Sequence, residues 1–193
     1  MVRNEKHNIL INSHQLLMRE RDCNYTLDRL ASDLKRSKKT LYKFFRSKNQ
    51  LITEVFKEHL EYINRLFEEI EHSDISEIDK LIKYIYLVDE SLREIRLSRW
   101  YEQAKKHTGI KDNYFELRVD CYEHYLNKGL TPFEPQLEYY GQTKPLLSSF
   151  LVSSLEANYF RSTLQEITER KPLEYVEKLI FLLHGCLISL KND

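Results

Sequence analysis

The amino-acid sequence predicts an all-α protein. The chain has 193 residues but only four glycines and four prolines, so the residues that most often interrupt a helix are scarce. Apolar residues recur at three- and four-residue intervals, as at Leu27, Leu30 and Leu34, which is the period of a helix with one buried face. No run that alternates apolar and polar residues is long enough to indicate a strand. The length allows one or two domains with a sizeable core.

The first part of the chain should form four helices, of which the first covers residues 4–20. Thr26 and Ser37 each stand before an apolar helical pattern, and their hydroxyl groups are suited to cap two short helices. Ser47 is followed three residues later by a glutamine, which is the spacing of a capping box, and it opens a long helix over residues 48–71. We expect this long helix to be a stiff connection between the segments before and after it.

The rest of the chain should form four more helices. Their expected ranges are 76–106, 111–128, 145–169 and 173–191. Gly129 is expected to end the second of these helices, and residues 130–138, which contain two prolines, are expected to form a loop. Pro145 and Pro172 suit the first turn of the last two helices, because an N–H group there has no partner within the helix.

Charge is distributed unevenly along the chain, although the 30 basic and 30 acidic residues balance to a net charge of zero. Residues 1–58 contain 13 basic and 7 acidic residues, a net charge of +6. The remaining 135 residues contain 17 basic and 23 acidic residues, a net charge of −6. Positive charge on a small N-terminal segment is typical of a nucleic-acid-binding domain attached to a part with another task.

Two lysines stand where local helix stability alone would not select them. Lys38 and Lys39 fall at the first two positions of the helix expected after Ser37. Cations at a helix N-terminus oppose the helix dipole by roughly a few tenths of a kcal/mol each, and a phosphate group nearby would compensate. Two short helices around a tight turn, the second of them basic, therefore predict a helix-turn-helix that binds DNA. The alternative is an ordinary solvated basic turn.

Residues 26–51 resemble the DNA-binding domain of TetR-family transcriptional regulators. The resemblance is carried by Thr26-Leu27, Leu30-Ala31, Thr40-Leu41-Tyr42-Lys43-Phe44-Phe45, Ser47-Lys48 and Leu51. It implies a three-helix DNA-binding head at residues 1–47, joined by the long helix to a helical body at residues 48–193 that binds a ligand and dimerises. It also implies that the middle helix enters the major groove. The residues it places at the DNA are Thr26, Arg36, Ser37, Lys38, Lys39, Thr40, Tyr42, Lys43 and Lys48.

The turn departs from the family pattern. Where the family has Gly-Val-Ser, this chain has Lys35-Arg36-Ser37, and no glycine stands in residues 21–24. Lys35 should then adopt, with some strain, a left-handed conformation that glycine adopts freely. Arg36 replaces a buried valine and must point outward, because a buried unpaired charge is unstable. These departures keep open a different function, that of a helix-turn-helix adaptor that binds a protein partner instead of DNA.

The last two helices are the most apolar part of the chain. The final one is apolar nearly all round, so it must be covered on more than one side, and Gly185 offers a place for close approach of a second backbone. The resemblance implies that these two helices pair with their copies in a homodimer, although an internal core is the alternative. The residues expected in the dimer interface are Phe150, Leu151, Tyr159, Leu179, Leu183 and Leu187.

The body is also rich in aromatic residues. The resemblance implies a pocket among its central helices that binds a small effector. The residues expected to line it are Trp100, Tyr101, Tyr122 and Tyr125. Aromatic walls with hydroxyl groups would suit an amphipathic compound, but the same side chains are also ordinary core material.

Several other functions find no support in the sequence. There is no glycine-rich phosphate loop and no nucleophile elbow, and Cys121 with His124 is too small a set for a metal site, so we expect neither an enzyme nor a cofactor or metal. A helical enzyme or metal protein is the disfavoured alternative. The N-terminus lacks the apolar core of a signal peptide, and the apolar run at residues 179–190 is too short to cross a bilayer. We therefore expect a cytoplasmic protein that does not enter the membrane.

The function implied by the resemblance is that of a DNA-binding transcriptional regulator. It would be a ligand-responsive homodimeric repressor that binds a palindromic operator in double-stranded DNA. Its partners would be DNA, a second copy of itself and a small amphipathic effector.

Overall fold

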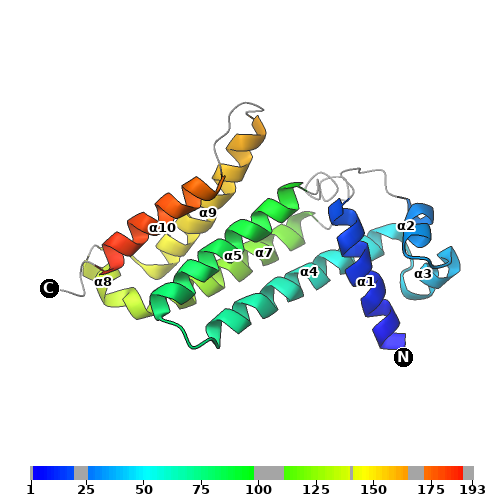
Figure 1. Ribbon diagram of the computed structural model, residues 1–193, viewed down its shortest axis with the longest axis horizontal. Coiled ribbons are helices and arrows are strands. Elements are labelled where there is room, and N and C mark those ends of the chain that lie inside the picture. The colour runs from blue at the N-terminus through cyan, green and yellow to red at the C-terminus, as the bar shows by residue number, and fades with distance from the viewer. Residues whose placement is uncertain (1, 20–25, 98–110, 140, 165–171, 189–193) are drawn as a thin grey trace. The chain divides into compact units, whose positions relative to one another are not determined.

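A computed structural model describes residues 2–19, 26–97, 111–139, 141–164 and 172–188, and these residues form helices joined by short turns (Figure 1). The predicted all-α fold class is confirmed. The helices, in chain order, are α1 (Val2–Arg19), α2 (Leu27–Asp33), α3 (Lys38–Phe44), α4 (Lys48–Glu71), α5 (Glu77–Leu97), α7 (Lys111–Leu130), the 3-10 helix η1 (Thr131–Phe133), α8 (Glu134–Tyr139), α9 (Lys144–Leu164) and α10 (Pro172–Ile188).

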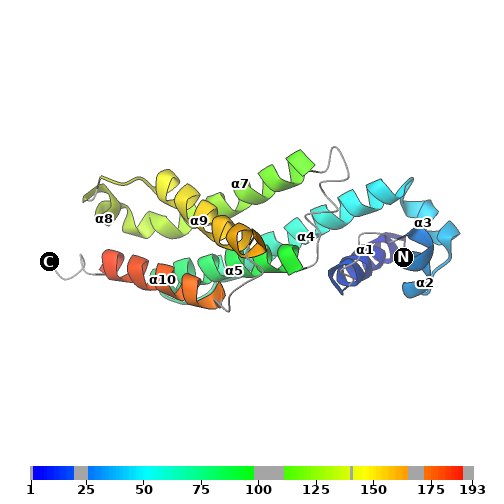
Figure 2. The same ribbon diagram turned by 90° about the horizontal axis from the view of Figure 1, so that it is seen from above.

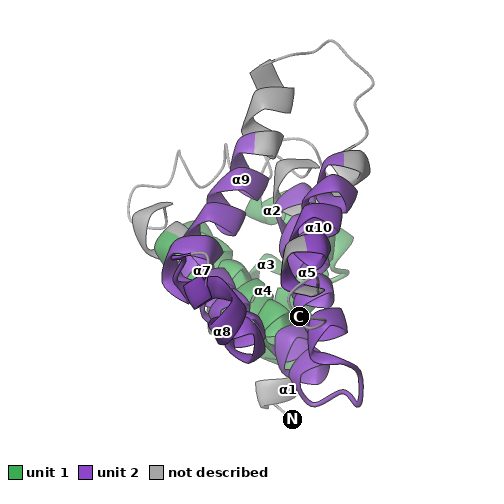
Figure 3. Ribbon diagram, turned by 90° about the vertical axis from the view of Figure 1, so that its left-hand side faces the viewer, with its two compact units in different colours: residues 1–64, 94–117 green, residues 65–93, 118–193 purple. Residues whose placement is uncertain are grey.

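The chain divides into two compact units (Figure 3). Unit 1 consists of residues 1–64 and 94–117, and unit 2 consists of residues 65–93 and 118–193. Helices α4, α5 and α7 each contribute residues to both units. The division into a head at residues 1–47 and a body at residues 48–193 concerns separate functions and stays a prediction.

Unit 1 is built around an apolar core to which α2 and α3 each contribute only a few residues. Helix α2 packs against α1 and α3 (Figures 1 and 2). The buried core residues are Ile9, Leu10, Leu30, Ala31, Leu41, Phe45, Leu51, Ile52, Val55, Phe56 and Tyr114. Most of this cluster lies on the apolar faces expected from the helical periodicity, so the sequence pattern determines which side of each short helix faces the core.

Side-chain caps start α2, α3 and α4 where the sequence predicts them. Thr26 Oγ1 accepts a hydrogen bond from the Arg29 N–H at 3.2 Å, and Ser37 Oγ accepts one from the Thr40 N–H at 3.0 Å. Ser47 Oγ accepts from the Gln50 N–H at 3.1 Å. The return bond of this capping box is displaced by one residue, because Gln50 Oε1 accepts from the N–H of Arg46 at 2.6 Å, not from that of Ser47.

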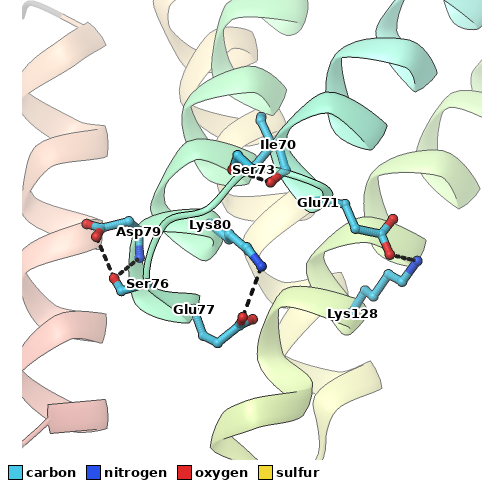
Figure 4. Close-up of polar contacts among 8 residues, drawn as sticks. All are labelled: Ile70, Glu71, Ser73, Ser76, Glu77, Asp79, Lys80 and Lys128. Carbon is cyan, nitrogen blue, oxygen red and sulfur yellow. Dashed lines mark hydrogen bonds and ion pairs between the residues drawn. The ribbon is translucent and has the colours of Figure 1, made fainter.

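The turn between α4 and α5 is held by similar local contacts (Figure 4). Ser76 Oγ accepts from the Asp79 N–H at 3.2 Å and donates to the Asp79 carboxylate at 2.5 Å, so Ser76 caps the start of α5. Glu71, the last residue of α4, forms an ion pair with Lys128 of α7. The hydrogen bond from Lys128 lowers the pKa of the Glu71 carboxyl below its usual value.

The sequence prediction for the end of α7 is wrong. The helix continues past Gly129 to Leu130, and the chain then forms η1 and α8 where a loop was expected. The two prolines do not prevent this, because each stands in the first turn of a new helix, where its missing N–H group leaves no carbonyl unpaired. Phe133 and Leu137 are buried and anchor η1 and α8.

Gly129 has a packing role. A Cβ atom on it would lie 2.8 Å from Tyr84 Cδ2 and 3.2 Å from Leu81 Cδ1, so α7 can approach α5 this closely only with a glycine.

Of the glycines in the described residues, Gly141 has a positive φ, of 66°. It follows α8 in the turn that leads to α9, which begins at Lys144 with Pro145 in its first turn, as expected. Pro172 is the first residue of α10.

Candidate nucleic-acid interface

The turn between α2 and α3 closes as a Schellman motif. The N–H of Lys35 donates to Ser32 O at 2.9 Å, and the N–H of Arg36 donates to Ala31 O at 2.8 Å. Lys35 has a φ of 52°, so it occupies the left-handed position that glycine usually fills. That conformation is disfavoured for an L-residue by roughly 1–2 kcal/mol. The left-handed conformation predicted for Lys35 is confirmed.

Arg36 points into solvent, as predicted for a charged residue at this place. Half of its side chain is exposed, and its Nε lies 3.8 Å from a carboxylate oxygen of Glu5 on α1. The pair is loose and solvated, so Arg36 retains most of its freedom to interact with another anion.

Helix α3 has a buried side and a polar, basic side. Leu41 and Phe45 are almost completely buried and hold the helix on the core of unit 1. Most of the residues predicted to contact DNA, in α3 and next to it, are exposed. Thr26, Arg36, Ser37, Lys38, Lys39, Tyr42 and Lys43 are exposed, while Thr40 and Lys48 are half-buried. Tyr42 is an exposed aromatic residue, with 49% of its surface accessible.

The two hydroxyl groups at the start of α3 are already engaged with each other. Ser37 Oγ lies 2.8 Å from Thr40 Oγ1 and also accepts from the Thr40 N–H. Each hydroxyl oxygen can still exchange a hydrogen bond with an additional group, because a hydroxyl both donates and accepts.

The lysines on this surface fall into two classes. The Lys38 ammonium lies 2.7 Å and 2.8 Å from the two carboxylate oxygens of Asp28, which is in the first turn of α2. The hydrogen bond to Asp28 raises the pKa of Lys38 above its ordinary value. By contrast, no carboxylate of the described residues lies within ion-pair distance of Lys39, Lys43 or Lys48.

Of the residues predicted to line a pocket, Tyr122 and Tyr125 lie in an aromatic cluster of unit 2. The Tyr125 ring stacks on Phe67 with ring centres 4.3 Å apart, and Tyr84 packs at 5.5 Å from the same Phe67 ring. Tyr122 is fully buried, and its hydroxyl donates to Ser91 Oγ at 2.5 Å. Burial raises the pKa of Tyr122 to about 12. Trp100 and Tyr101 lie outside the described residues, so the pocket stays a prediction.

Sequence reasoning missed Arg118, which lies next to this cluster. Arg118 is 6% exposed, and its guanidinium donates to Glu156 of α9 at 2.7 Å and lies 5.7 Å from the centre of the Tyr122 ring. Its position on α7, four residues before Tyr122, was the available signal, because that spacing puts both side chains on one side of the helix.

The residues expected in a dimer interface are divided between core and surface. Leu151 and Leu187 are buried within the chain itself, which removes them from any surface that a second copy could contact in this conformation. Leu179 and Leu183 are half-buried, and the side chain of Tyr159 lies outside the described residues. Phe150 is 58% exposed. Further exposed apolar side chains on α9 and α10 were not predicted, and they are Leu146, Phe181 and Leu182.

Three further observations concern Cys121, metal ligands and membrane-spanning helices. Burial raises the pKa of the half-buried Cys121 thiol to about 12, which disfavours the reactive thiolate. Within the described ranges, no three His, Cys, Asp or Glu residues gather in a way that could hold a metal ion. None of the helices described here combines the length and the apolar character needed to cross a membrane.

Comparisons with known proteins add information on the fold alone. No protein-family model matches the chain, and no curated protein matches it. Among solved structures, the chain is similar to one titled "Crystal structure of superantigen PfiT". The match has a TM-score of 0.63 and 15% sequence identity, and it covers 92% of this chain and 94% of the other. At that identity the likeness says that the two chains share a helical fold over nearly their whole length, and nothing about shared activity.

Proposed function

We propose that this protein is a DNA-binding transcriptional regulator of the TetR type. The observation that carries the proposal is the exposed surface of α3 together with the start of α4. There Lys39, Lys43 and Lys48 form no ion pair with a described residue, while Leu41 and Phe45 hold α3 firmly on its core. A rigidly held helix whose outer side is basic suits the width and charge of the DNA major groove.

In the proposed complex α3 lies in the major groove. Lys39 and Lys43 reach toward base edges, and Lys48, at the start of α4, contacts a phosphate group. Contacts to phosphate supply affinity for all DNA, whereas contacts to base edges supply sequence preference. Tyr42 and Thr26, which are also exposed, have hydroxyl groups suited to additional contacts with the DNA backbone.

The regulator acts as a homodimeric repressor on a palindromic operator in the cytoplasm. The exposed apolar side chains of α9 and α10 support the dimer, because a soluble monomer rarely exposes several large apolar residues close together. A small amphipathic effector bound in the helical body shifts the protein toward a conformation with weaker DNA affinity. Such coupling is typically about 1–3 kcal/mol.

One observation favours a second candidate, an adaptor that binds a protein partner. Lys38 and Arg36, both predicted DNA contacts, are paired with the carboxylates of Asp28 and Glu5. A surface of mixed charge is less suited to DNA than a uniformly basic one and is more suited to a protein with both kinds of charge. The two candidates predict different results in the same experiment.

The test measures the affinity of the full chain for DNA at several salt concentrations. Lys48→Ala should weaken binding to all sequences about equally and reduce the slope of log affinity against log salt by about 1, as the loss of a phosphate contact requires. Lys43→Ala should weaken binding and also change which sequences a random pool yields after selection. Lys57→Ala removes an equal charge from an exposed position further along α4 and is the matched control.

A parent protein that binds no duplex at low salt would refute the proposal in favour of the adaptor. If Lys43→Ala and Lys48→Ala bound DNA no differently from Lys57→Ala, the proposed binding surface would be wrong, because α3 and the start of α4 would then make no contact with DNA.

A further inference from the structure

Asp28 is an acidic residue of α2 that pairs with a lysine of α3. It stands in the first turn of α2, yet its carboxylate reaches the first residue of α3 and contacts the Lys38 ammonium at 2.7 Å and 2.8 Å. The side chains of Asp28 and Lys38 are 70% and 48% exposed, so the pair is open to solvent on the surface that also presents Lys39.

This pair changes what Lys38 can do. Exposed ion pairs are weak and are screened by salt, so the Lys38 ammonium can leave Asp28 when a stronger anion arrives. A DNA phosphate is such an anion, but taking Lys38 leaves the Asp28 carboxylate unpaired near the negatively charged backbone. If Lys38 instead stays with Asp28, one phosphate contact is lost. In either case Asp28 reduces the gain from bringing α3 close to DNA.

We propose that Asp28 is a built-in competitor of DNA phosphate for Lys38, and that it thereby lowers the affinity for non-specific DNA. The inference rests on the proposed function. Non-specific affinity depends almost entirely on phosphate contacts, so the loss of one such contact lowers it directly. A specific complex also has base contacts, from Lys39 and Lys43 in the proposed arrangement, which Asp28 does not compete for. Asp28 therefore weakens the attachment to duplex DNA of any sequence and leaves the base contacts unaffected.

The decisive variant is Asp28→Asn in the full chain, with binding measured to a short duplex of arbitrary sequence. The variant should bind more tightly than the parent, and the slope of log affinity against log salt should steepen by about 0.9, the value for one additional phosphate contact. The ratio of the variant's affinity to that of the parent should thus increase about 3.5-fold for each fourfold dilution of salt. Asparagine is tolerated in this exposed position of a first helical turn, and a thermal melt verifies that the variant is folded.

Glu61→Gln is the matched control. Glu61 is exposed on α4 in unit 1 and forms no ion pair with any described residue, so its loss removes one negative charge without releasing a lysine. It should leave the salt slope unchanged. A slope for Asp28→Asn equal to that for Glu61→Gln would overturn the inference, because net charge alone would then account for the effect.

A double-mutant cycle identifies the lysine. In a Lys38→Gln background, Asp28→Asn should no longer steepen the salt slope, since no ammonium is left to release. A steeper slope that persists in this background would refute the competition for Lys38. Failure of the proposed function gives a different result, because neither the parent nor any variant would then bind a duplex at low salt. In that case the inference about Asp28 is also wrong.

Discussion

Two imidazole rings meet in unit 1, that of the half-buried His14 and that of the buried His59. His14 of α1 stacks on His59 of α4, with ring centres 4.7 Å apart and an angle of 20° between the ring planes. Burial lowers the pKa of His14 below its ordinary value of 6.5, because the charged imidazolium loses more hydration than the neutral ring. The folded protein therefore holds His14 neutral under conditions in which the unfolded chain would protonate it.

The free energy of unfolding should consequently fall in mild acid. Below the ordinary pKa of 6.5 the unfolded state binds a proton at His14 that the folded state does not, so stability is lost as the pH decreases. Urea unfolding at about pH 7.5 and at about pH 5.5 measures this loss. His14→Leu should reduce the difference between the two conditions, whereas His184→Leu, at an exposed position of α10, should not. An equal pH dependence in the parent and His14→Leu would contradict the role given to His14.

For single residues, the sequence predicts backbone conformation and exposure better than it predicts which side chains form ion pairs. The left-handed Lys35 and the exposed Arg36 follow from the position of each residue within a short turn, which neighbouring residues determine. The pairing of Lys38 with Asp28 joins residues ten apart on two helices. It depends on how α2 and α3 pack, and helical periodicity carries no information about that.

For whole helices too, features set by neighbouring residues are predictable from the sequence, whereas features set by packing are not. Helix starts at Thr26, Ser37 and Ser76 were predictable because a cap hydroxyl bonds a backbone N–H only a few residues later. The end of α7 was not predictable from the sequence. A glycine such as Gly129 can end a helix or permit close packing of two helices, and the sequence does not distinguish these roles. The Tyr84 side chain that decides between the two is far away in the chain.

Two glycines that lie in helices of the described residues, Gly129 and Gly185, provide a matched test of this interpretation. In a helix, alanine is more stable than glycine by roughly 0.5–1 kcal/mol when nothing obstructs its methyl group. Gly185 of α10 has no atom within 4 Å of an added Cβ, so Gly185→Ala should stabilise the isolated chain by about that amount. At Gly129 the added Cβ would lie 2.8 Å from Tyr84, and overpacking typically costs about 1–3 kcal/mol, which exceeds the helix gain. Gly129→Ala should therefore destabilise, as measured by denaturant unfolding. Stabilisation by both substitutions would show that α7 and α5 do not approach as closely as described.

At the scale of the whole molecule, the main feature is a set of exposed apolar side chains on α9 and α10. Leu146 and Phe150 are 60% and 58% exposed on α9, and Phe181 and Leu182 are 77% and 63% exposed on α10. The two helices pack against each other, so these side chains belong to adjoining elements of unit 2. A two-fold dimer buries the same surface on both copies, and a palindromic operator requires that symmetry. The surface follows from the apolar character of the last two helices, but which residues lie outward depended on packing that periodicity did not resolve.

Phe150→Glu should separate the proposed dimer without unfolding the chain. Phe150 is already 58% exposed, so the chain tolerates a charge there, whereas burial of that charge against a second copy is strongly unfavourable. Light scattering at micromolar concentration should give about twice the chain mass for the parent and the single chain mass for the variant. Tyr62→Glu is the control, because Tyr62 is 48% exposed on α4 in unit 1 and should leave the mass of the parent unchanged. The separated variant should also bind a full palindrome no more tightly than a single half-site, because each head would then bind independently. A parent protein that is monomeric at this concentration would exclude the dimer and, with it, the palindromic operator.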